Sequence, residues 1–294
     1  MDKNTFILPN KMRDPFLFEE VLNRQEELLT GNGMLDLSDV SFVEPHSILC
    51  LLLLGRNYLR SKGEKIQLVN IPIAVHQYLG RMDFFAANIF NIRTPLNEKY
   101  MLKRSSFSSR VIEITEIPNK ERKSIAVINS VIALFRKRAS FILKYWMNES
   151  VVDYFVTVIS ELCQNIFEHS LDSGYLSMQT YSYANENIFR FAIADSGIGI
   201  KESFAAREDL KSRTNAELIE MALTQPISSK REFGFGLCQV NTIIKIMKGS
   251  IYIRSGDSAV TAMYHNAKSD SSVIFLKDGL TDFNGTQISI SLFA

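Results

Sequence analysis

The chain has 294 residues, with 33 Lys and Arg against 32 Asp and Glu and a formal net charge of +1. So small a charge excludes the strong positive field that would favour nucleic acid or an acidic membrane as the main partner. Apolar residues make up 46% and charged residues 22%, a composition typical of a globular protein and not of a disordered one. The length suffices for two domains, so we expect a division near the middle.

Apolar runs and cysteines indicate where the protein works. No run approaches the roughly 18 residues that span a bilayer, and the longest, residues 48–54, ends at a glycine. The start lacks the apolar core and cleavage site of a secretory signal. Cys50, Cys163 and Cys238 are widely spaced among apolar neighbours, which favours buried free thiols over disulfides or a metal site. We therefore expect a cytoplasmic protein without membrane or direct nucleic-acid contact.

The first part of the chain alternates helical and strand patterns. Apolar residues at helical spacing predict helices over 16–29, 47–62 and 73–81, and shorter apolar runs predict strands within 34–43 and at 66–69. Gly63 follows one helix at a position typical of a C-cap. Strands alternating with helices predict a parallel or mixed sheet with helices packed on it.

Residues 16–90 resemble a STAS domain, the fold of anti-sigma-factor antagonists. The resemblance rests on a strand, a loop, a helix and a short strand, in the stretch DLSDVSFVEPHSILCLLLLGRNYLRSKGEKIQLVN. Where that family usually has Asp-Ser-Ser-Gly, this chain has Glu44-Pro45-His46-Ser47. Pro45 stands at the position of the phosphorylated serine and has no hydroxyl, and we expect Ser47 to cap the helix. The resemblance thus implies a binding or scaffolding module, with Ser47 as a phosphoacceptor the alternative.

A polar, basic stretch over 91–109 indicates a connection between domains. We place a STAS-like domain at 1–95, a linker at 96–110 and a second domain at 111–294. In the last of these, apolar patterns predict strands at 111–117, 175–183 and 188–194, helices at 124–141 and 236–247, and three or four final strands ending at 286–293. Residues 201–224 are polar and partly helical, without a core pattern in their first half.

The stretch ELCQNIFEHS, residues 161–170, sets polar and apolar residues on different faces of one helix. Each residue turns the helix by about 100°, so Glu161, Asn165 and His169 lie near one line. Asn165 offers a neutral oxygen suited to Mg2+. Glu161, one turn earlier, could polarise a water or a protein hydroxyl. The alternative is that both residues only solvate the outer face of an amphipathic helix.

Two glycine motifs follow. Asp195 comes directly after an apolar strand, and Gly197 and Gly199 allow the backbone to turn sharply and approach a flat ring. A carboxylate fixed there can accept a hydrogen bond from the exocyclic amine of adenine, although an ordinary Asp-Ser-Gly turn is the alternative. In GFGL, residues 234–237, the glycines allow backbone N–H groups to meet phosphate at a helix N-terminus.

With Gly285-Thr286 near the last strand, these motifs resemble the GHKL superfamily of ATPases, which includes histidine kinases, anti-sigma-factor kinases and gyrase. The resemblance covers residues 105–294 and implies ATP and Mg2+ as cofactors, Glu161 as the catalytic base and Asn165 as the metal ligand. The candidate nucleotide-binding residues are Asn165, Asp195, Gly197, Gly199, Lys230, Gly234, Phe235, Gly236, Leu237 and Thr286. Lys230 is a candidate because it lies just before GFGL, where a solvated loop is the alternative.

The ending NIFEHS is most similar to the anti-sigma-factor kinase branch. His169 either helps to orient Glu161 or is a packed histidine at the helix end. No long dimerisation helix with a phosphoaccepting histidine precedes the motifs, which argues against a two-component sensor kinase. The segment between Gly199 and Gly234 falls where this superfamily has its mobile ATP lid.

The predicted fold is α/β (α+β), with an N-terminal STAS-like domain and a C-terminal Bergerat-type α/β sandwich. The expected function is that of an ATP-binding regulatory protein in which an anti-sigma-type serine kinase or Mg2+-dependent ATPase domain is fused to a STAS-like interaction module. The alternative is an ATP-gated conformational switch or a scaffold with little or no phosphotransfer. Expected partners are a separate regulatory protein, STAS-type or sigma-factor-like, and a second copy in a homodimer.

Overall fold

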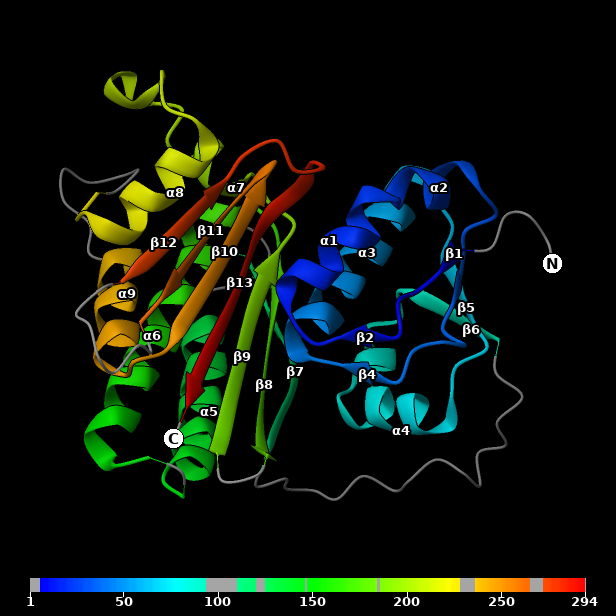
Figure 1. The fold of residues 1–294 in the computed structure, drawn as a ribbon, viewed down its shortest axis with the longest axis horizontal. Coiled ribbons are helices and arrows are strands. Elements are labelled where there is room, and N and C mark those ends of the chain that lie inside the picture. Colours follow the sequence, from blue (N-terminus) through cyan, green and yellow to red (C-terminus); the bar gives the residue numbers. More distant parts are fainter. Residues whose placement is uncertain are drawn as a thin grey trace. The chain divides into compact units, whose positions relative to one another are not determined.

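The chain forms two compact units in a computed structural model, Met1–Ser108 and Ser109–Ala294 (Figure 1). The model describes residues 6–93, 110–119, 125–145, 147–183, 186–227, 236–264 and 272–293. Each unit has its own sheet and its own helices. This mixture of helices and strands confirms the predicted α/β class.

The first unit is built on a parallel four-stranded sheet with strand order β1-β3-β5-β6, beside a parallel pair of β2 and β4. Its elements are β1 (Phe6–Ile7), β2 (Lys11–Met12), α1 (Pro15–Asn23), α2 (Gln25–Thr30), β3 (Met34–Asp36), β4 (Phe42–Val43), α3 (Pro45–Lys62), β5 (Ile66–Val69), α4 (Ile73–Arg81), the 3-10 helix η1 (Phe84–Ala87) and β6 (Phe90–Arg93). The predicted alternation of strands and helices around a parallel or mixed sheet is confirmed, and the sheet is parallel.

Two boundaries in this unit differ from the predictions. The helix expected over 16–29 is interrupted at Arg24, which ends α1 and precedes α2. The polar stretch expected to begin a connection at residue 91 begins instead within strand β6, which pairs in parallel with β5. Residues 91–93 are exposed on this edge strand. Because an edge strand tolerates polar residues, composition alone did not reveal it.

Helix α3 is the apolar centre of the first unit, and its residues from Pro45 to Arg56 are buried. The prediction that Ser47 caps this helix is wrong, because Glu44 holds the N-cap position and Pro45 the first turn. Proline suits that turn, since its missing N–H would have no partner within the helix. The buried Ser47 hydroxyl instead donates to the carbonyl of Met12 at 3.3 Å. Gly63 ends the helix in the left-handed region, with φ 72°, as predicted.

The second unit is built on an antiparallel seven-stranded sheet with strand order β12-β11-β10-β13-β9-β8-β7. Its elements are β7 (Val111–Ile117), α5 (Ile125–Leu143), α6 (Glu149–Asn165), the π-helical turn η3 (Ile166–Ser170), β8 (Gly174–Tyr183), β9 (Glu186–Asp195), α7 (Gly199–Ser203), the 3-10 helix η4 (Glu208–Leu210), α8 (Asn215–Thr224), α9 (Gly236–Ile246), β10 (Ser250–Gly256), β11 (Ser258–Met263), β12 (Val273–Lys277) and β13 (Phe283–Phe293). A helical layer on one sheet is the predicted α/β sandwich.

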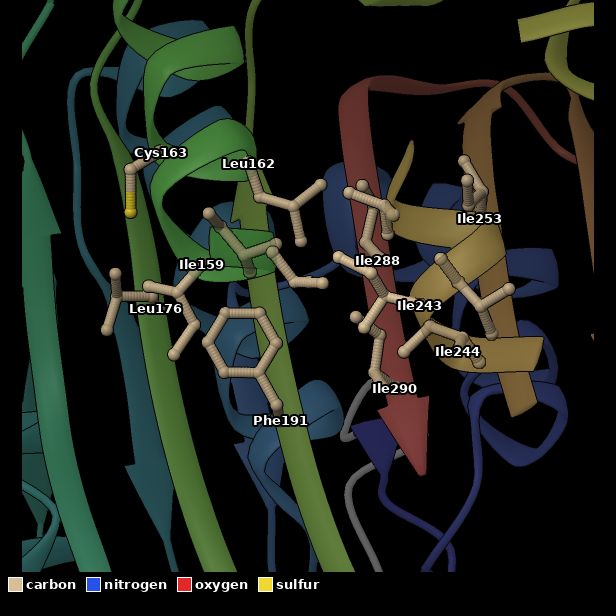
Figure 2. Close-up of a cluster of buried hydrophobic side chains, with 14 of the residues drawn as sticks. Ile159, Leu162, Cys163, Leu176, Phe191, Ile243, Ile244, Ile253, Ile288 and Ile290 are labelled. Atoms are coloured by element: carbon tan, nitrogen blue, oxygen red, sulfur yellow. The ribbon is translucent and has the colours of Figure 1, made fainter. Parts of the chain in front are cut away.

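Apolar side chains from the helices and the sheet form the core of this unit. Figure 2 shows Ile159 and Leu162 of α6 and Ile243 of α9 pointing toward Phe191 of β9 and Ile288 of β13. All five are at most 5% exposed. Burying one such side chain contributes about 1.5–3 kcal/mol. This packing fixes α6 and α9 on the sheet.

The segment 201–224 holds core residues that the sequence pattern did not reveal. Phe204 and Leu210 are buried in the hydrophobic core, although no core pattern was predicted there. Each follows or ends a short helix, so no apolar period runs long enough to be recognised. The segment is therefore packed against the sheet as well as charged.

The structure can be compared with two predictions from the sequence, that the cysteines are buried free thiols and that no segment spans a membrane. Cys50 and Cys163 are buried free thiols, whereas Cys238 is partly exposed. Burial raises the pKa of the Cys163 thiol. Within the described ranges, no helix has the length and apolar character needed to cross a membrane.

Candidate functional site

A cavity lies in the second unit where the end of α6, the end of β9 and the helices α7, α8 and α9 come together. Its volume is about 140 Å³, close to the roughly 150 Å³ of an engineered cavity that holds one benzene ring. It is lined by Leu162, Asn165, Ile166, His169, Ser170, Ile193, Asp195, Gly199, Ile200, Ser203, Phe204, Ala222, Ile227, Gly236, Leu237, Thr286 and Ile288. Mainly apolar walls with a few polar groups suit a flat aromatic ring held in one orientation.

Asp195 provides the buried carboxylate of this cavity. The residue is 4% exposed, and its Oδ1 accepts hydrogen bonds from the Ser170 hydroxyl at 2.6 Å and from the Gly197 N–H at 2.8 Å. Burial raises the pKa of Asp195 to about 6, and the bonds from Ser170 and Gly197 oppose that rise. The nearby charge of Asp172 raises the pKa further. The backbone N–H of Thr286 also donates to this carboxylate. Three donors from different segments of the chain therefore hold it.

Two glycines let backbone segments pack closely around Asp195. A Cβ on Gly197 would lie 1.8 Å from the carbonyl oxygen of Ser170. A Cβ on Gly285, which has φ +87°, would lie 2.0 Å from the carbonyl oxygen of Asp195. Gly197 therefore contacts Ser170 and does not line the cavity, whereas Gly199, with φ +75°, does line it.

Helix α6 places polar residues of the predicted motif at the cavity. The helix begins at Asn148, whose side chain accepts the N–H of Val151 at 3.0 Å. Its last residue, Asn165, lines the cavity, and the π-helical turn η3 that follows adds His169 and Ser170. The Nε2 of His169 lies 3.9 Å from a carboxylate oxygen of Glu168. The predicted division of this helix into a packed face and a polar face is confirmed.

Helix α9 begins beside the same polar face. A Cβ on Gly236, its first residue, would lie 3.5 Å from Oδ1 of Asn165 and 3.9 Å from Oε2 of Glu161. Glu161 is half-buried and borders this point without lining the cavity. The first N–H groups of a helix lack partners within the helix and carry a partial positive charge. The arrangement suits an anionic group that extends from the cavity toward the start of α9.

The structure brings together most of the predicted site residues that it describes. Those that line the cavity are Asn165, Asp195, Gly199, Gly236, Leu237 and Thr286. Gly197 and Glu161 border it through Ser170 and Gly236, respectively. The remaining candidates lie outside the described residues: Lys230, Gly234 and Phe235.

The donor set at the cavity fits a magnesium ion that arrives with a phosphate ligand. In the part of the chain that the structure describes, no group of three or more His, Cys, Asp or Glu side chains could hold a metal ion. Mg2+ commonly takes only one or two protein oxygens and completes its shell with substrate phosphates and waters. The side-chain oxygen of Asn165 can supply one such ligand.

Several polar residues of the site escaped prediction. Ser196 donates to Oδ2 of Asp172 at 2.7 Å, and Ser255 accepts the N–H of Ile200 at 2.8 Å. They support the cavity from separate elements, so no local spacing identifies them. For two serines of the site the sequence did hold a signal: Ser170 ends the helix motif, and Ser196 directly follows Asp195.

Comparison with known proteins assigns a domain to this part of the chain. Residues 151–278 match the family model described as histidine kinase-, DNA gyrase B-, and HSP90-like ATPase. The matched range contains the helix motif, Asp195 and Gly236, and it ends before Thr286. No curated protein matches the chain. Residues 151–278 therefore lie in a C-terminal ATPase domain of the GHKL type, and this assignment supports ATP binding at the cavity.

Proposed function

We propose that this protein is an ATP-dependent regulator in which a serine kinase or ATPase domain of the anti-sigma type is joined to a STAS-like interaction module. The observation that carries the proposal is the shared cavity of Asp195, Asn165 and Gly236. Asp195 offers an acceptor to the exocyclic amine of adenine within apolar walls. Asn165 and the N-terminus of α9 suit magnesium and the triphosphate.

Glu161 has the position expected of a general base. Phosphoryl transfer needs a group that orients or deprotonates the nucleophile and positive groups around the transferred phosphate. Glu161 lies one turn before Asn165, and its Oε2 approaches the first residue of α9. In the proposed step, a serine hydroxyl of a separate regulatory protein gives its proton to Glu161. The serine oxygen bonds to the γ-phosphorus of ATP as the bond between that phosphorus and the leaving ADP breaks.

The first unit is proposed to bind a partner and not to accept phosphate. Pro45 has no hydroxyl, and Ser47 is buried with its hydroxyl donated to the Met12 carbonyl. Phosphorylation of Ser47 would require the start of α3 to separate from β2. These facts favour an interaction module over a phosphorylated switch.

The direct test is transfer of labelled γ-phosphate from ATP with Mg2+ to a purified STAS-type protein. The full chain should label that protein or release labelled phosphate, and Glu161→Ala should bind ATP yet lose both activities. Glu161→Gln is the matched variant, because it keeps the shape of the side chain and removes the base. Labelling that survives both substitutions would remove Glu161 from the mechanism.

An ATP-gated switch without phosphotransfer is the second candidate. It is favoured by the contact of the cavity with the segment between Gly199 and Ile227, which contributes Phe204 and Ala222 to the lining. A bound nucleotide would touch this segment directly and could order it. Hydrogen exchange of residues 199–227 should then slow with ATP in Glu161→Gln as much as in the wild type. Equal protection in a variant without turnover would favour the switch, whereas protection that requires turnover would exclude it.

A further inference from the structure

Ser170 joins the end of η3 to the end of β9. Its hydroxyl donates to Oδ1 of Asp195 at 2.6 Å, and its carbonyl accepts the N–H of Ile198 at 3.1 Å. Gly197 packs against the same carbonyl. Ser170 is 5% exposed and still lines the cavity. It therefore touches both the carboxylate and the space that a ligand would occupy.

The groups that hold Oδ1 of Asp195 are donors. The Gly197 N–H can only donate, and the Ser170 hydroxyl uses its proton for the same oxygen. A carboxylate held in this way stays an acceptor toward the cavity. It can pair with the exocyclic amine of adenine, but it meets the carbonyl of hypoxanthine or guanine as one acceptor against another.

We propose that Ser170 is a positioning residue that holds Asp195 as an acceptor and thereby sets the preference of the cavity for a purine that carries its exocyclic amine at C6. The inference rests on the proposed ATP binding. It goes beyond that binding by assigning base selectivity to a hydroxyl that acts through Asp195.

A second serine–aspartate pair makes the role of Ser170 separable from general packing. Ser196 donates to Asp172 at 2.7 Å, so the two pairs cross between the same two segments. Ser170 and Asp195 are the last residues of η3 and β9, and Asp172 and Ser196 follow these elements. Neither Ser196 nor Asp172 lines the cavity. Loss of the Ser170 hydroxyl should therefore change ligand selection as well as stability.

The ionisable groups near Asp195 permit a pH test. The elements around it contribute Asp172, His169, the exposed Lys201 and Glu202 of α7, and Arg254 of β10, which donates to backbone carbonyls. The bond from Ser170 lowers the pKa of Asp195 against the larger effect of burial. Removing the hydroxyl should raise that pKa further, so Asp195 becomes protonated and loses its acceptor character at a higher pH.

The experiment compares the affinities of the full chain for ATP and for inosine triphosphate, which has a carbonyl in place of the amine. Calorimetry from pH 5.5 to 8 would give both dissociation constants. In Ser170→Ala, the ratio of the dissociation constants for inosine triphosphate and ATP should fall about tenfold. The pH below which ATP affinity declines should also be higher than in the wild type. Where Asp195 is ionised, binding of inosine triphosphate should change little, because its base makes no bond to an acceptor carboxylate.

Matched variants separate this role from folding. Ser170→Thr keeps a hydroxyl and should keep the preference. Ser177→Ala removes a buried hydroxyl that donates to the Ile112 carbonyl at 3.1 Å, away from the cavity, and should leave the preference unchanged. If thermal unfolding shows Ser170→Ala to be unfolded, Ser170→Cys, with a weak donor of similar size, provides the same comparison.

The outcomes distinguish the two proposals. A wild type that binds neither nucleotide would overturn the proposed function. A wild type that prefers ATP, with a folded Ser170→Ala or Ser170→Cys that keeps both the preference and the pH profile, would overturn only the role of Ser170.

Discussion

The two ends of the cavity are built in different ways. At the end where the base is proposed to bind, called the base end, Asp195 is 4% exposed and accepts two hydrogen bonds of 2.8 Å or less through Oδ1. At the other end, Asn165 and Glu161 are half-buried beside the first residue of α9. A buried acceptor that is held in place by two donors is preorganised before any ligand arrives. The half-buried end, where the phosphates are proposed to bind, is called the phosphate end, and a metal and phosphates would complete its charges. We therefore expect substitutions at the base end to change mainly affinity and substitutions at the phosphate end to change mainly turnover.

The largest separation is expected from Glu161→Gln at the phosphate end. General-base catalysis contributes roughly 10²–10⁴-fold to a rate, so turnover or transfer should fall by that factor. Affinity for ATP should stay within about threefold of the wild type, because the base end is untouched. Steady-state turnover beside calorimetry checks both halves of this prediction. A variant that loses affinity and turnover equally would show that the two ends are not independent.

At the base end, Gly285→Ala should be the most damaging change to stability. Its Cβ would lie 2.0 Å from the Asp195 carbonyl, at φ +87°, so the clash and the backbone strain together should lower the free energy of unfolding by about 3–4 kcal/mol. Gly279→Ala is the matched control, because Gly279 has φ +73° with no atom within 4 Å of the added Cβ. It should cost only about 1 kcal/mol. Denaturant unfolding measures both, and equal losses would contradict the close packing at Asp195.

The buried carboxylate of Asp195 should also make stability and ATP affinity depend on pH in opposite directions. The pKa of Asp195 is raised from 3.8 to about 6, so between these values the folded state binds a proton that the unfolded state does not. Stability contributed by this group therefore rises as pH falls from 6 to 4, by up to about 3 kcal/mol. Affinity for ATP should fall over the same range, because the acceptor is lost.

Asp195→Asn provides the comparison for that pH effect, since an amide does not titrate. Subtracting its unfolding free energy from that of the wild type at each pH isolates the contribution of Asp195 from that of other carboxylates. The difference should shift in favour of the wild type as pH falls. A difference that does not change between pH 4 and pH 7 would show that Asp195 is not desolvated.

The sequence revealed residues whose chemistry and spacing are local, and missed those that depend on distant packing. Asn165 and Asp195 were found because each lies in a short motif with a chemical purpose. The bond between Ser170 and Asp195 escaped prediction because it joins residues 25 positions apart. No helical or strand period reports which turn will meet which strand end.

The first unit gives the same lesson at the level of the fold. A parallel or mixed sheet was predictable, because strands and helices alternate along the chain. Strand β6 was hidden by its exposed polar residues at the sheet edge. The start of α3 was misplaced because Pro45 occupies its first turn. Ser47 therefore lies inside the helix, where its hydroxyl donates to the Met12 carbonyl.

The smallest effect is expected from a substitution at the start of α8, which tests whether this helix is coupled to the base end. Thr214 caps α8 in a capping box with Glu217, and Asp278 accepts hydrogen bonds from the Thr214 hydroxyl and the Ala216 N–H, both at 3.1 Å. Thr214→Ala should cost about 1 kcal/mol of unfolding free energy. Because α8 contributes Ala222 to the cavity, ATP affinity should fall by up to about fivefold if the nucleotide must order α8.

Thr224→Ala, which removes a hydroxyl at the other end of α8 that donates to the Glu220 carbonyl, is the control within the same helix. Affinity that drops in Thr214→Ala and not in Thr224→Ala would place the cap of α8 in the binding equilibrium. An unchanged affinity in both would mean that the base end is complete without this helix terminus.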